Sequence, residues 1–344
     1  EQTGDVTFTK NEKEPLEADA VIVDETSMVD LALMRALLAA LRPGCRLVLV
    51  GDPDQLPSVG AGNVFGDLIR SERVATVALK DIFRQAEQSA IVRSAHLVNE
   101  GRLPELQNTA ASDFFFLPRR DSARLVDTVV ELCRTRLPEK MHIPAESIQV
   151  LTATRKGDTG TAALNRALQA ALNPPSAAKP SLTWGENLFR LGDKVIQTKN
   201  DYQIEYTRQT PFGPEEGQGV FNGDVGYIER IDPAEHMMTV LFDDDRVVTY
   251  QKQQLDALDL AYSLTVHKSQ GSEFPVVVMP VVGGPPMLMA RNLLYTALTR
   301  ARQLVVLVGR EEVIQQMVEN DHVAKRYTTL KDRLLAAAQL GPEA

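Results

Sequence analysis

Two acidic residues end a short apolar run near the start of the chain. The run occupies residues 20–24, so that Asp24 and Glu25 stand at its end. Such a run is typical of a buried parallel strand, and open α/β sheets bind ligands outside the carboxyl ends of their strands. Asp24 suits Mg²⁺, which prefers hard oxygen ligands, and Glu25 can orient and deprotonate an attacking water. A solvated acidic cap at a strand end would explain the same two residues without chemistry.

A second apolar run, at residues 46–50, is followed by the turn GDPDQLP, which carries Gln55. A neutral amide at the end of a neighbouring strand can sense the γ-phosphate of a nucleotide or hold the attacking water. A plain turn would account for the glycine, aspartate and prolines of this segment. It would not account for two such strand ends in this order and spacing, so we interpret them as parts of one nucleotide site.

Six segments follow one another along the chain: VIVDETSMVD, VGDPDQLPSVGAG, LKDIFRQ, VLTATRKG, AYSLTVHKSQGSEF and LLYTALTRAR. In this order they resemble motifs II, III and IV, a DNA-contacting segment, and motifs V and VI of superfamily 1 DNA helicases. The form of the motifs is that of the RecD-like family, which includes the exodeoxyribonuclease V alpha subunit. Several motifs in order are far more specific than one. The resemblance implies ATP and Mg²⁺ as cofactors, with Asp24 of the Walker B motif as the metal ligand.

The resemblance also supplies two arginines and two nucleotide-contacting residues. Arg84 of motif IV and Arg300 of motif VI carry planar, fixed charges suited to stabilising a phosphoryl group during transfer. In the family both arginines belong to the second motor lobe, so hydrolysis depends on closure of the two lobes around ATP. Gly271 and Glu273 are expected near the ribose. Arg302 is interpreted as a member of a surface ion pair.

Two polar and basic segments, TATRKG and SLTVHKS, are predicted to contact DNA phosphates through side-chain donors. The alternatives are a solvated basic turn for the first segment and a structural histidine in the second. The candidate contacts are Thr154, Arg155, Lys156, Thr265, His267 and Lys268.

The elements that position these residues alternate between strands and helices. Apolar runs at residues 74–79, 114–118, 149–153, 275–282 and 304–309 are predicted strands, and helices are predicted at residues 31–41, 87–99, 122–136, 161–172 and 287–302. This pattern predicts an α/β protein with RecA-like parallel-sheet lobes, the first of them partial. Short β runs between residues 193 and 250 interrupt it, which predicts a small SH3-like β-barrel inserted in the second lobe. The polar segment 205–219 is interpreted as a mobile loop.

Four domain segments are predicted from these changes of pattern. They are residues 1–82, the end of the first motor domain; residues 83–190, the first part of the second; residues 191–252, the inserted SH3-like subdomain; and residues 253–344, the remainder of the second motor domain.

Composition adds limits of its own. The formal net charge is -9, so nucleic-acid binding would need a local basic groove instead of a basic surface. The sequence contains no run of about 18 apolar residues to span a membrane and does not start like a signal peptide, so we expect a cytoplasmic protein without a membrane partner. Cys45 and Cys133 lack metal-binding spacing and are expected to be reduced thiols.

The 344 residues contain no phosphate loop of the form G-x-x-x-x-G-K-[ST]. In the family this loop precedes motif II, so we expect a fragment that lacks it. Each lost charge-assisted contact to the phosphates weakens binding by about 1.5 to 3 kcal/mol, so the fragment alone is expected to be inactive. A degenerate relative would be the alternative.

The leading hypothesis is an ATP-dependent helicase or translocase on single-stranded DNA and duplex ends, acting in recombination and repair. Translocation from 5′ to 3′ and partnership with other subunits of a recombination nuclease complex are carried over from the family. A non-catalytic DNA-binding or subunit-docking module is the alternative from another class. A metal-dependent nuclease built on Asp24, Glu25, Asp52 and Asp54 would leave Gln55 and the two arginines unexplained.

Overall fold

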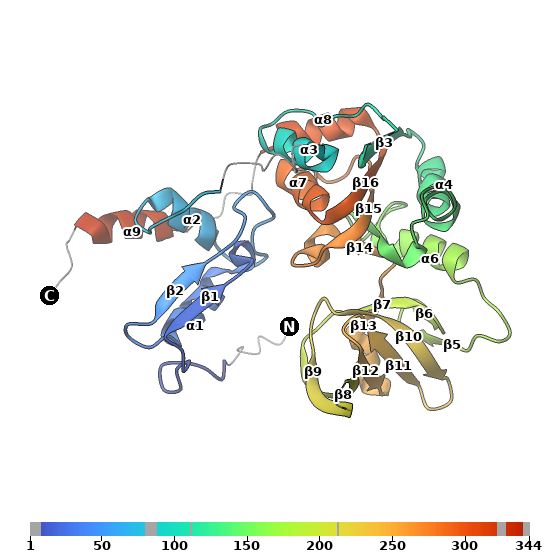
Figure 1. Ribbon diagram of the computed structural model, residues 1–344, viewed down its shortest axis with the longest axis horizontal. Coiled ribbons are helices and arrows are strands. Elements are labelled where there is room, and N and C mark those ends of the chain that lie inside the picture. The colour runs from blue at the N-terminus through green and yellow to red at the C-terminus, as the bar shows by residue number, and fades with distance from the viewer. Residues whose placement is uncertain (1–7, 80–87, 111, 212, 322–327, 340–344) are drawn as a thin grey trace.

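The computed structural model describes residues 8–79, 88–110, 112–211, 213–321 and 328–339. Figure 1 shows three regions: an N-terminal α/β unit, a second α/β lobe, and a β domain beside that second lobe. Parallel sheets in both lobes and a mainly antiparallel sheet between the segments of the second lobe confirm the predicted fold class. No helix in the described part of the chain is long and apolar enough to cross a membrane.

The first lobe contains a two-stranded parallel sheet of β1 (Ala20–Val23) and β2 (Arg46–Leu49), with helices α1 (Leu31–Ala39) and α2 (Val64–Ser71). Each helix begins at a polar cap. The Asp30 side chain accepts from the backbone of α1 at 2.8 Å, and Asn63 accepts from that of α2 at 3.1 Å. The start of α1 agrees with the helix predicted at residues 31–41.

Two details of the first lobe differ from prediction. The paired residues Ile22 and Val48 are 70% and 46% exposed, so this face of the small sheet is open among the described residues and the strands are not buried. Residues 74–79 form no strand, and Val77 and Leu79 are almost fully exposed. An apolar run becomes a strand only where a neighbouring strand pairs with its backbone groups.

The second lobe is built on a five-stranded parallel sheet in the order β14-β4-β15-β16-β3. The strands are β3 (Phe114–Pro118), β4 (Ile148–Thr152), β14 (Ser263–Thr265), β15 (Phe274–Val281) and β16 (Ala301–Gly309). The three central strands are buried along most of their length, which explains their nearly continuous apolar sequences.

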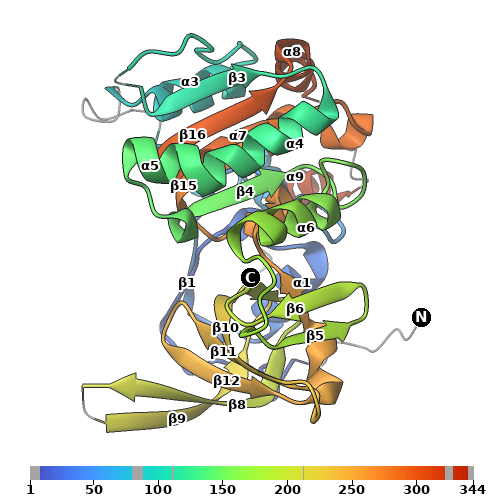
Figure 2. The ribbon, with the colours of Figure 1, turned by 90° about the vertical axis from the view of Figure 1, so that its right-hand side faces the viewer.

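Helices cover both faces of this sheet (Figure 2). One face carries α4 (Ser122–Glu131), α5 (Leu137–Met141) and α6 (Thr161–Leu172); the other carries α3 (Ala90–Asn99), α7 (Arg291–Thr299) and α8 (Glu311–Glu319). Alternate residues of β15 point to the two faces of the sheet. Val276 and Val278 belong to one core cluster, and Val277 and Met279 belong to the other. Helix α7 is shorter than the predicted 287–302, because β16 already begins at Ala301.

The inserted domain is a seven-stranded antiparallel sheet in the order β13-β7-β10-β11-β12-β8-β9, with a β5–β6 hairpin beside it. The strands are β5 (Ser181–Trp184), β6 (Asn187–Arg190), β7 (Lys194–Gln197), β8 (Asp201–Thr210), β9 (Gly213–Val220), β10 (Val225–Asp232), β11 (Met237–Phe242), β12 (Arg246–Tyr250) and β13 (Leu258–Leu260). Because β4 precedes the domain and β14 follows it, the domain is an insertion in the second lobe. Its sheet continues through β13, beyond the predicted end at residue 252.

The prediction of a mobile loop at residues 205–219 is wrong. The segment forms the β8–β9 hairpin, whose strands pair from Asp201 opposite Val220 to Thr210 opposite Gly213. Arg208 and Glu215 form an ion pair of 2.8 Å across it, and β8 also pairs with β12. Most side chains of the paired strands near Arg208 and Glu215 are polar, so the alternation that marks a strand is missing from their sequence.

One further segment lies outside the lobe predicted for it. Helix α9 (Leu330–Gln339) lies in the segment predicted for the second motor domain, yet it lies against α2 of the first lobe (Figure 1). Leu330 packs there against the cluster of Val29, Met34 and Val64.

Cys45 and Cys133 are both free, which agrees with the expectation of thiols. Burial raises the pKa of Cys133 to about 12.

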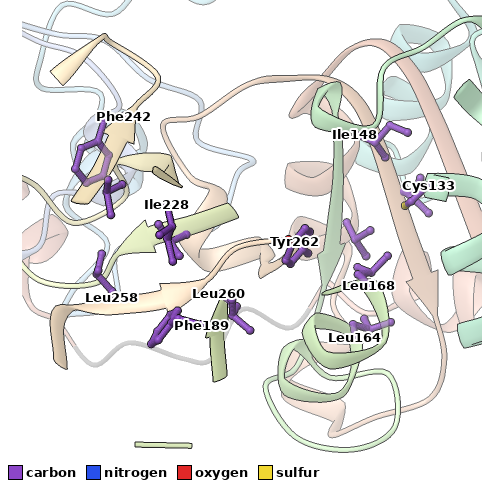
Figure 3. Close-up of a cluster of buried hydrophobic side chains, with 14 of the residues drawn as sticks. Cys133, Ile148, Leu164, Leu168, Phe189, Ile228, Phe242, Leu258, Leu260 and Tyr262 are labelled. Atoms are coloured by element: carbon purple, nitrogen blue, oxygen red, sulfur yellow. The ribbon is translucent and has the colours of Figure 1, made fainter. Parts of the chain in front are cut away.

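A continuous core joins the inserted domain to the second lobe. Figure 3 shows Phe189, Leu260 and Tyr262 between the β strands of the domain and Leu164 and Leu168 of α6.

A fully buried carboxylate, that of Asp193, lies in the same joint. It accepts from Gln169 Nε2 at 2.5 Å, Asn173 Nδ2 at 2.7 Å, the Arg190 backbone nitrogen at 2.7 Å and the Tyr262 hydroxyl at 2.9 Å. Four donors from the lobe and the domain therefore share one acceptor group.

Replacing Asp193 with alanine is expected to lower the free energy of unfolding by about 3 kcal/mol, because several buried donors lose their acceptor. The shift of the urea-unfolding midpoint measures the effect. Glu229→Ala, an exposed change in the same domain, should change stability by less than about 0.5 kcal/mol. Equal midpoints for the two variants would contradict a structural role for the Asp193 carboxylate.

Candidate functional site

Asp24 and Glu25 lie directly after β1, at the carboxyl end of the small parallel sheet. Asp24 Oδ1 accepts from the Glu25 backbone nitrogen at 2.8 Å. Glu25 has a φ of 49°, in the left-handed region that non-glycine residues rarely occupy. Such outliers gather at functional sites, where the surrounding structure holds a strained residue in place. The neighbouring strand end is close, because the Thr26 nitrogen donates to Val50 oxygen at 2.9 Å.

Arg300 brings the predicted catalytic residues of the two lobes together. It follows α7 of the second lobe and is only 4% exposed. Its Nη2 donates to Gln55 Oε1 at 2.9 Å, and its Nη1 lies 3.5 Å from Glu25 Oε1. Both partners belong to the first lobe. Arg84, the other predicted arginine, lies outside the described residues.

The guanidinium of Arg300 also has a buried donor that is not used. Its Nε is buried and has no acceptor among the described residues. Buried donors are normally satisfied, and an arginine fork matches the oxygens of phosphate in geometry and charge. The arrangement therefore fits a nucleotide phosphate between the lobes.

The loop that carries Gln55 is held by residues that the sequence patterns did not single out. The Leu56 nitrogen donates to Thr296 Oγ1 at 2.9 Å, and Gln270 Nε2 donates to Leu56 oxygen at 2.8 Å. The Leu56 side chain is buried in the core of the second lobe. Tyr295 donates to Asp52 Oδ2 at 2.9 Å, and burial raises the pKa of this tyrosine. These contacts attach the Gln55 loop to the second lobe.

Gly271 and Glu273 lie near Arg300, at the amino ends of β15 and β16. Arg300 Nη1 donates to the carbonyl of Ser272 at 3.2 Å. Gly271 adopts a φ of 76°, which favours glycine. Glu273 accepts from Arg302 Nε at 2.6 Å, so Arg302 occupies the surface ion pair expected of it. The ribose contact of Gly271 and Glu273 stays a prediction.

The carboxylates fit a nucleotide-bound Mg²⁺ better than a nuclease centre. Asp24 is exposed, and Mg²⁺ usually takes one or two protein carboxylates together with waters and substrate phosphates. Two of the four acids of the nuclease hypothesis already accept hydrogen bonds from the second lobe: Asp52 from Tyr295, and Asp54 from Asn99 Nδ2 at 2.7 Å. Among the described residues, no group of three or more His, Cys, Asp or Glu could hold a metal.

The two segments predicted to contact DNA lie side by side at the opposite, carboxyl edge of the second-lobe sheet. They follow β4 and β14, which are adjacent parallel strands with Thr152 opposite Thr265. Thr265 also caps the short helix η6 (Val266–Ser269), because its Oγ1 accepts from the Lys268 nitrogen at 3.3 Å. The Thr154 hydroxyl donates to Lys156 oxygen at 3.0 Å.

An acidic residue of the inserted domain lies between the two segments. Asp259 Oδ2 is 3.9 Å from Arg155 Nη2 and 4.0 Å from Lys268 Nζ. Burial lowers the pKa of Lys268, while the Asp259 carboxylate acts in the opposite direction. Burial also lowers the pKa of His267, which favours a neutral ring that can donate one N–H to a phosphate.

Three family models match the chain. An AAA domain matches residues 6–115, the SH3 domain of ATP-dependent RecD-like DNA helicases matches residues 164–242, and a UvrD-like helicase C-terminal domain matches residues 260–308. The first match covers the first lobe and the start of the second, the third covers a later part of the second lobe, and the second covers much of the inserted domain.

Two similar proteins align with nearly the whole chain. The chain is 36% identical over 329 residues to the ATP-dependent RecD2 DNA helicase of Deinococcus radiodurans, covering 96% of this chain and 41% of that protein. It is 31% identical to the RecBCD enzyme subunit RecD of Mycolicibacterium smegmatis, covering 96% of this chain and 56% of that protein. The chain thus spans about half the length of these relatives. The Bacteroides Pif1 helicase, solved in complex with ADP-AlF3 and ssDNA, matches with a TM-score of 0.53 and 20% identity, covering 96% of this chain and 78% of that one, and supports the fold alone.

Two parallel-sheet lobes that meet at Arg300, with an SH3-like domain inserted in the second, define a motor core of the superfamily 1 helicase class. Within that class, the matched domains and relatives show that the chain belongs to the RecD-like helicases.

Proposed function

We propose that the protein containing this chain is an ATP-driven cytoplasmic helicase or translocase that acts on single-stranded DNA and duplex ends in recombination and repair. One observation carries the proposal. The buried Arg300 of the second lobe reaches Gln55 and Glu25 of the first, so these three candidate catalytic residues come together only where the lobes meet.

Each side chain has a role in hydrolysis of the terminal phosphate. Asp24 would hold a Mg²⁺ ion, which would neutralise negative charge on the nucleotide phosphates, and Glu25 orients the attacking water and accepts its proton. The bond between the γ-phosphorus and its bridging oxygen breaks, and ADP leaves with the electron pair. Arg300 neutralises charge on the transferring group, and Gln55 holds the water or senses the γ-phosphate.

Translocation along DNA requires a connection between the proposed nucleotide site at Arg300 and the proposed DNA contacts. Residues 266–273 run from the carboxyl end of β14, beside the proposed DNA contacts, to the amino end of β15, beside Arg300. Gln270 of this segment is bonded to the Gln55 loop. A change of nucleotide state that alters the contact between the lobes is therefore transmitted to the DNA-contacting residues over a short distance.

The test is hydrolysis and unwinding by the full-length protein. ATP turnover should rise when single-stranded DNA is added, and a duplex with a 5′ overhang should be unwound faster than one with a 3′ overhang, as the RecD-like resemblance implies. A protein that binds ATP without turnover on single-stranded DNA would lose this function and retain the DNA-binding or subunit-docking alternative. Copurification with other subunits would support a role within a recombination nuclease complex.

Removing the charge of Asp259 is expected to tighten single-stranded DNA binding about fivefold, because a carboxylate beside Arg155 and Lys268 opposes a phosphate by about 1 kcal/mol. Asp259→Asn removes the negative charge and changes the shape of the side chain very little. The asparagine retains the oxygen that accepts from the Leu260 nitrogen at 3.0 Å and from Asn187 at 3.1 Å.

Fluorescence anisotropy with a labelled oligonucleotide measures this affinity. Glu229→Gln removes one charge from an exposed position of the same domain and should leave the affinity within about twofold. Weaker binding by Asp259→Asn would mean that Asp259 acts by holding the two cations in position.

A further inference from the structure

The second lobe changes its winding direction between two neighbouring strands. From β4 the chain continues through α6 and the inserted domain to β14, on one side of β4. From β15 it continues through α7 to β16, on the other side. Helices α6 and α7 consequently cover opposite faces of the sheet (Figure 2). In open α/β sheets, the crevice outside the carboxyl ends of two such strands is where ligands bind.

A cavity of about 360 Å³ lies at this position. Its walls are the segment after β4, from Thr154 to Thr159, and the end of β15 with Gly283 and Gly284. Arg310 after β16 and Arg120 after β3 complete the lining. The cavity therefore extends from the proposed DNA contacts Thr154 and Lys156 toward the far side of the sheet.

The charges of the lining favour an anion. It contains the cations Arg120, Lys156 and Arg310, and Asp158 is the single acid among its described residues. Arg120 lies 3.7 Å from the exposed Glu312, whereas Lys156 and Arg310 form no ion pair among the described residues. The loops after β3, β4 and β16 thus each contribute one cation to the lining of this cavity.

Glycine allows one of these cations to lie close to the cavity wall. A Cβ atom at Gly283 would come within 3.0 Å of Arg310 Nη2, and one at Gly284 would meet Met289 at 3.3 Å. The space beside these two glycines is therefore filled by the Arg310 and Met289 side chains, and the Arg310 guanidinium lies directly against the loop. The lining contains no aromatic ring, so it offers no stacking surface for a base. This chemistry suits a phosphate better than a nucleobase.

We propose that this cavity binds a backbone phosphate of single-stranded DNA, and that Arg310 and Arg120 continue the track that begins at Thr265 and Thr154. The proposal rests on the proposed function, because it assumes that the strand crosses this edge of the lobe. From β14 to β16 the sheet spans three strand spacings, about 14 Å, so the track holds more than one phosphate.

Arg310→Gln in the full-length protein tests the proposal. Its side chain is exposed, and the backbone bond from the Arg310 nitrogen to Val281 oxygen at 3.1 Å is retained. Affinity for an oligothymidine strand, measured over a series of salt concentrations, should fall about fivefold to tenfold. The slope of log K against log salt should become shallower by about 0.7, the value for one lost contact to a single strand. Arg120→Gln should add to both effects.

Two controls separate the pocket from general electrostatics. Arg310→Lys retains the charge and should recover most of the slope. Arg136→Gln removes the same charge from the exposed end of the segment after α4, outside the cavity lining, and should leave slope and affinity unchanged. Arg310→Gln with the parent's affinity and slope would overturn the proposal.

The source of the phosphate is distinguished by a second titration with inorganic phosphate at constant ionic strength. Phosphate binding that disappears in Arg310→Gln, with unchanged oligothymidine binding, would assign the cavity to free phosphate compounds and overturn the role in strand binding. If the proposed function itself is wrong, the parent protein will not bind the oligothymidine strand. A parent that binds and a variant that binds equally well contradict the pocket alone.

Discussion

Arg300→Ala in the full-length protein is expected to lower kcat for DNA-stimulated ATP hydrolysis by about 10³-fold or more. The variant removes the guanidinium that contacts Gln55 at 2.9 Å and lies 3.5 Å from Glu25, together with the buried Nε donor. An arginine supplied across a closing interface stabilises charge only during phosphoryl transfer, so kcat should fall more than the affinity for ATP. Steady-state hydrolysis at saturating single-stranded DNA measures both quantities.

Arg302→Ala is the matched control, since Arg302 is two residues away, exposed, and paired with Glu273 at the surface. Its kcat should stay within about threefold of the parent value, because a surface ion pair contributes little free energy. Binding of single-stranded DNA by Arg300→Ala without nucleotide should equal that of the parent and thereby verify the fold. A parent-like kcat in Arg300→Ala would contradict the catalytic role of Arg300, on which the proposed function rests.

The sequence predicted the strand ends well because the relevant signals are local. A short apolar run followed by acids placed Asp24 and Glu25 after β1, and a second run placed the Gln55 turn after β2. Parallel neighbours end at one edge of a sheet, so these residues had to be close to one another. The alternation of strands and helices indicated the α/β class in the same way.

Contacts between lobes have no such local signal. Gln55 and Arg300 are 245 positions apart, and the pairing of Leu56 with Thr296 spans 240. The resemblance named Arg300, but it gave no indication that Thr296 and Gln270 hold the Gln55 loop. Their residue types are ordinary in helices and turns, and only the packing of one lobe on the other gives them a role.

Other errors have the same origin in tertiary structure. The β8–β9 hairpin exposes polar residues on both faces, and its pairing with β12 decides its conformation. Asp259 belongs to the inserted domain, and its place between Arg155 and Lys268 depends on how that domain packs on the lobe. The prediction that both basic segments contact DNA phosphates therefore missed Asp259, whose carboxylate would compete with a phosphate for Arg155 and Lys268.

Glu25→Gln should bind ATP with nearly the parent affinity and hydrolyse it about 10² to 10⁴ times more slowly. Glutamine has the shape of glutamate and can still accept from Arg300, but it cannot take a proton from the attacking water. Single-turnover hydrolysis measures the chemical step, and a fluorescent ATP analogue measures binding. Because ATP remains bound, the variant should keep the affinity for single-stranded DNA that the parent shows in its ATP-bound state.

The left-handed backbone of Glu25 offers a second explanation for any loss, since a strained residue can fail when it is replaced. Glu72 separates the two causes. It follows α2 in the same lobe, is exposed, and has a φ of 53°, close to the 49° of Glu25. Glu72→Gln makes the same change of charge and should retain parent turnover. Slow hydrolysis confined to Glu25→Gln would then identify the carboxylate as the base, whereas parent-like hydrolysis in both variants would require another group to activate the water.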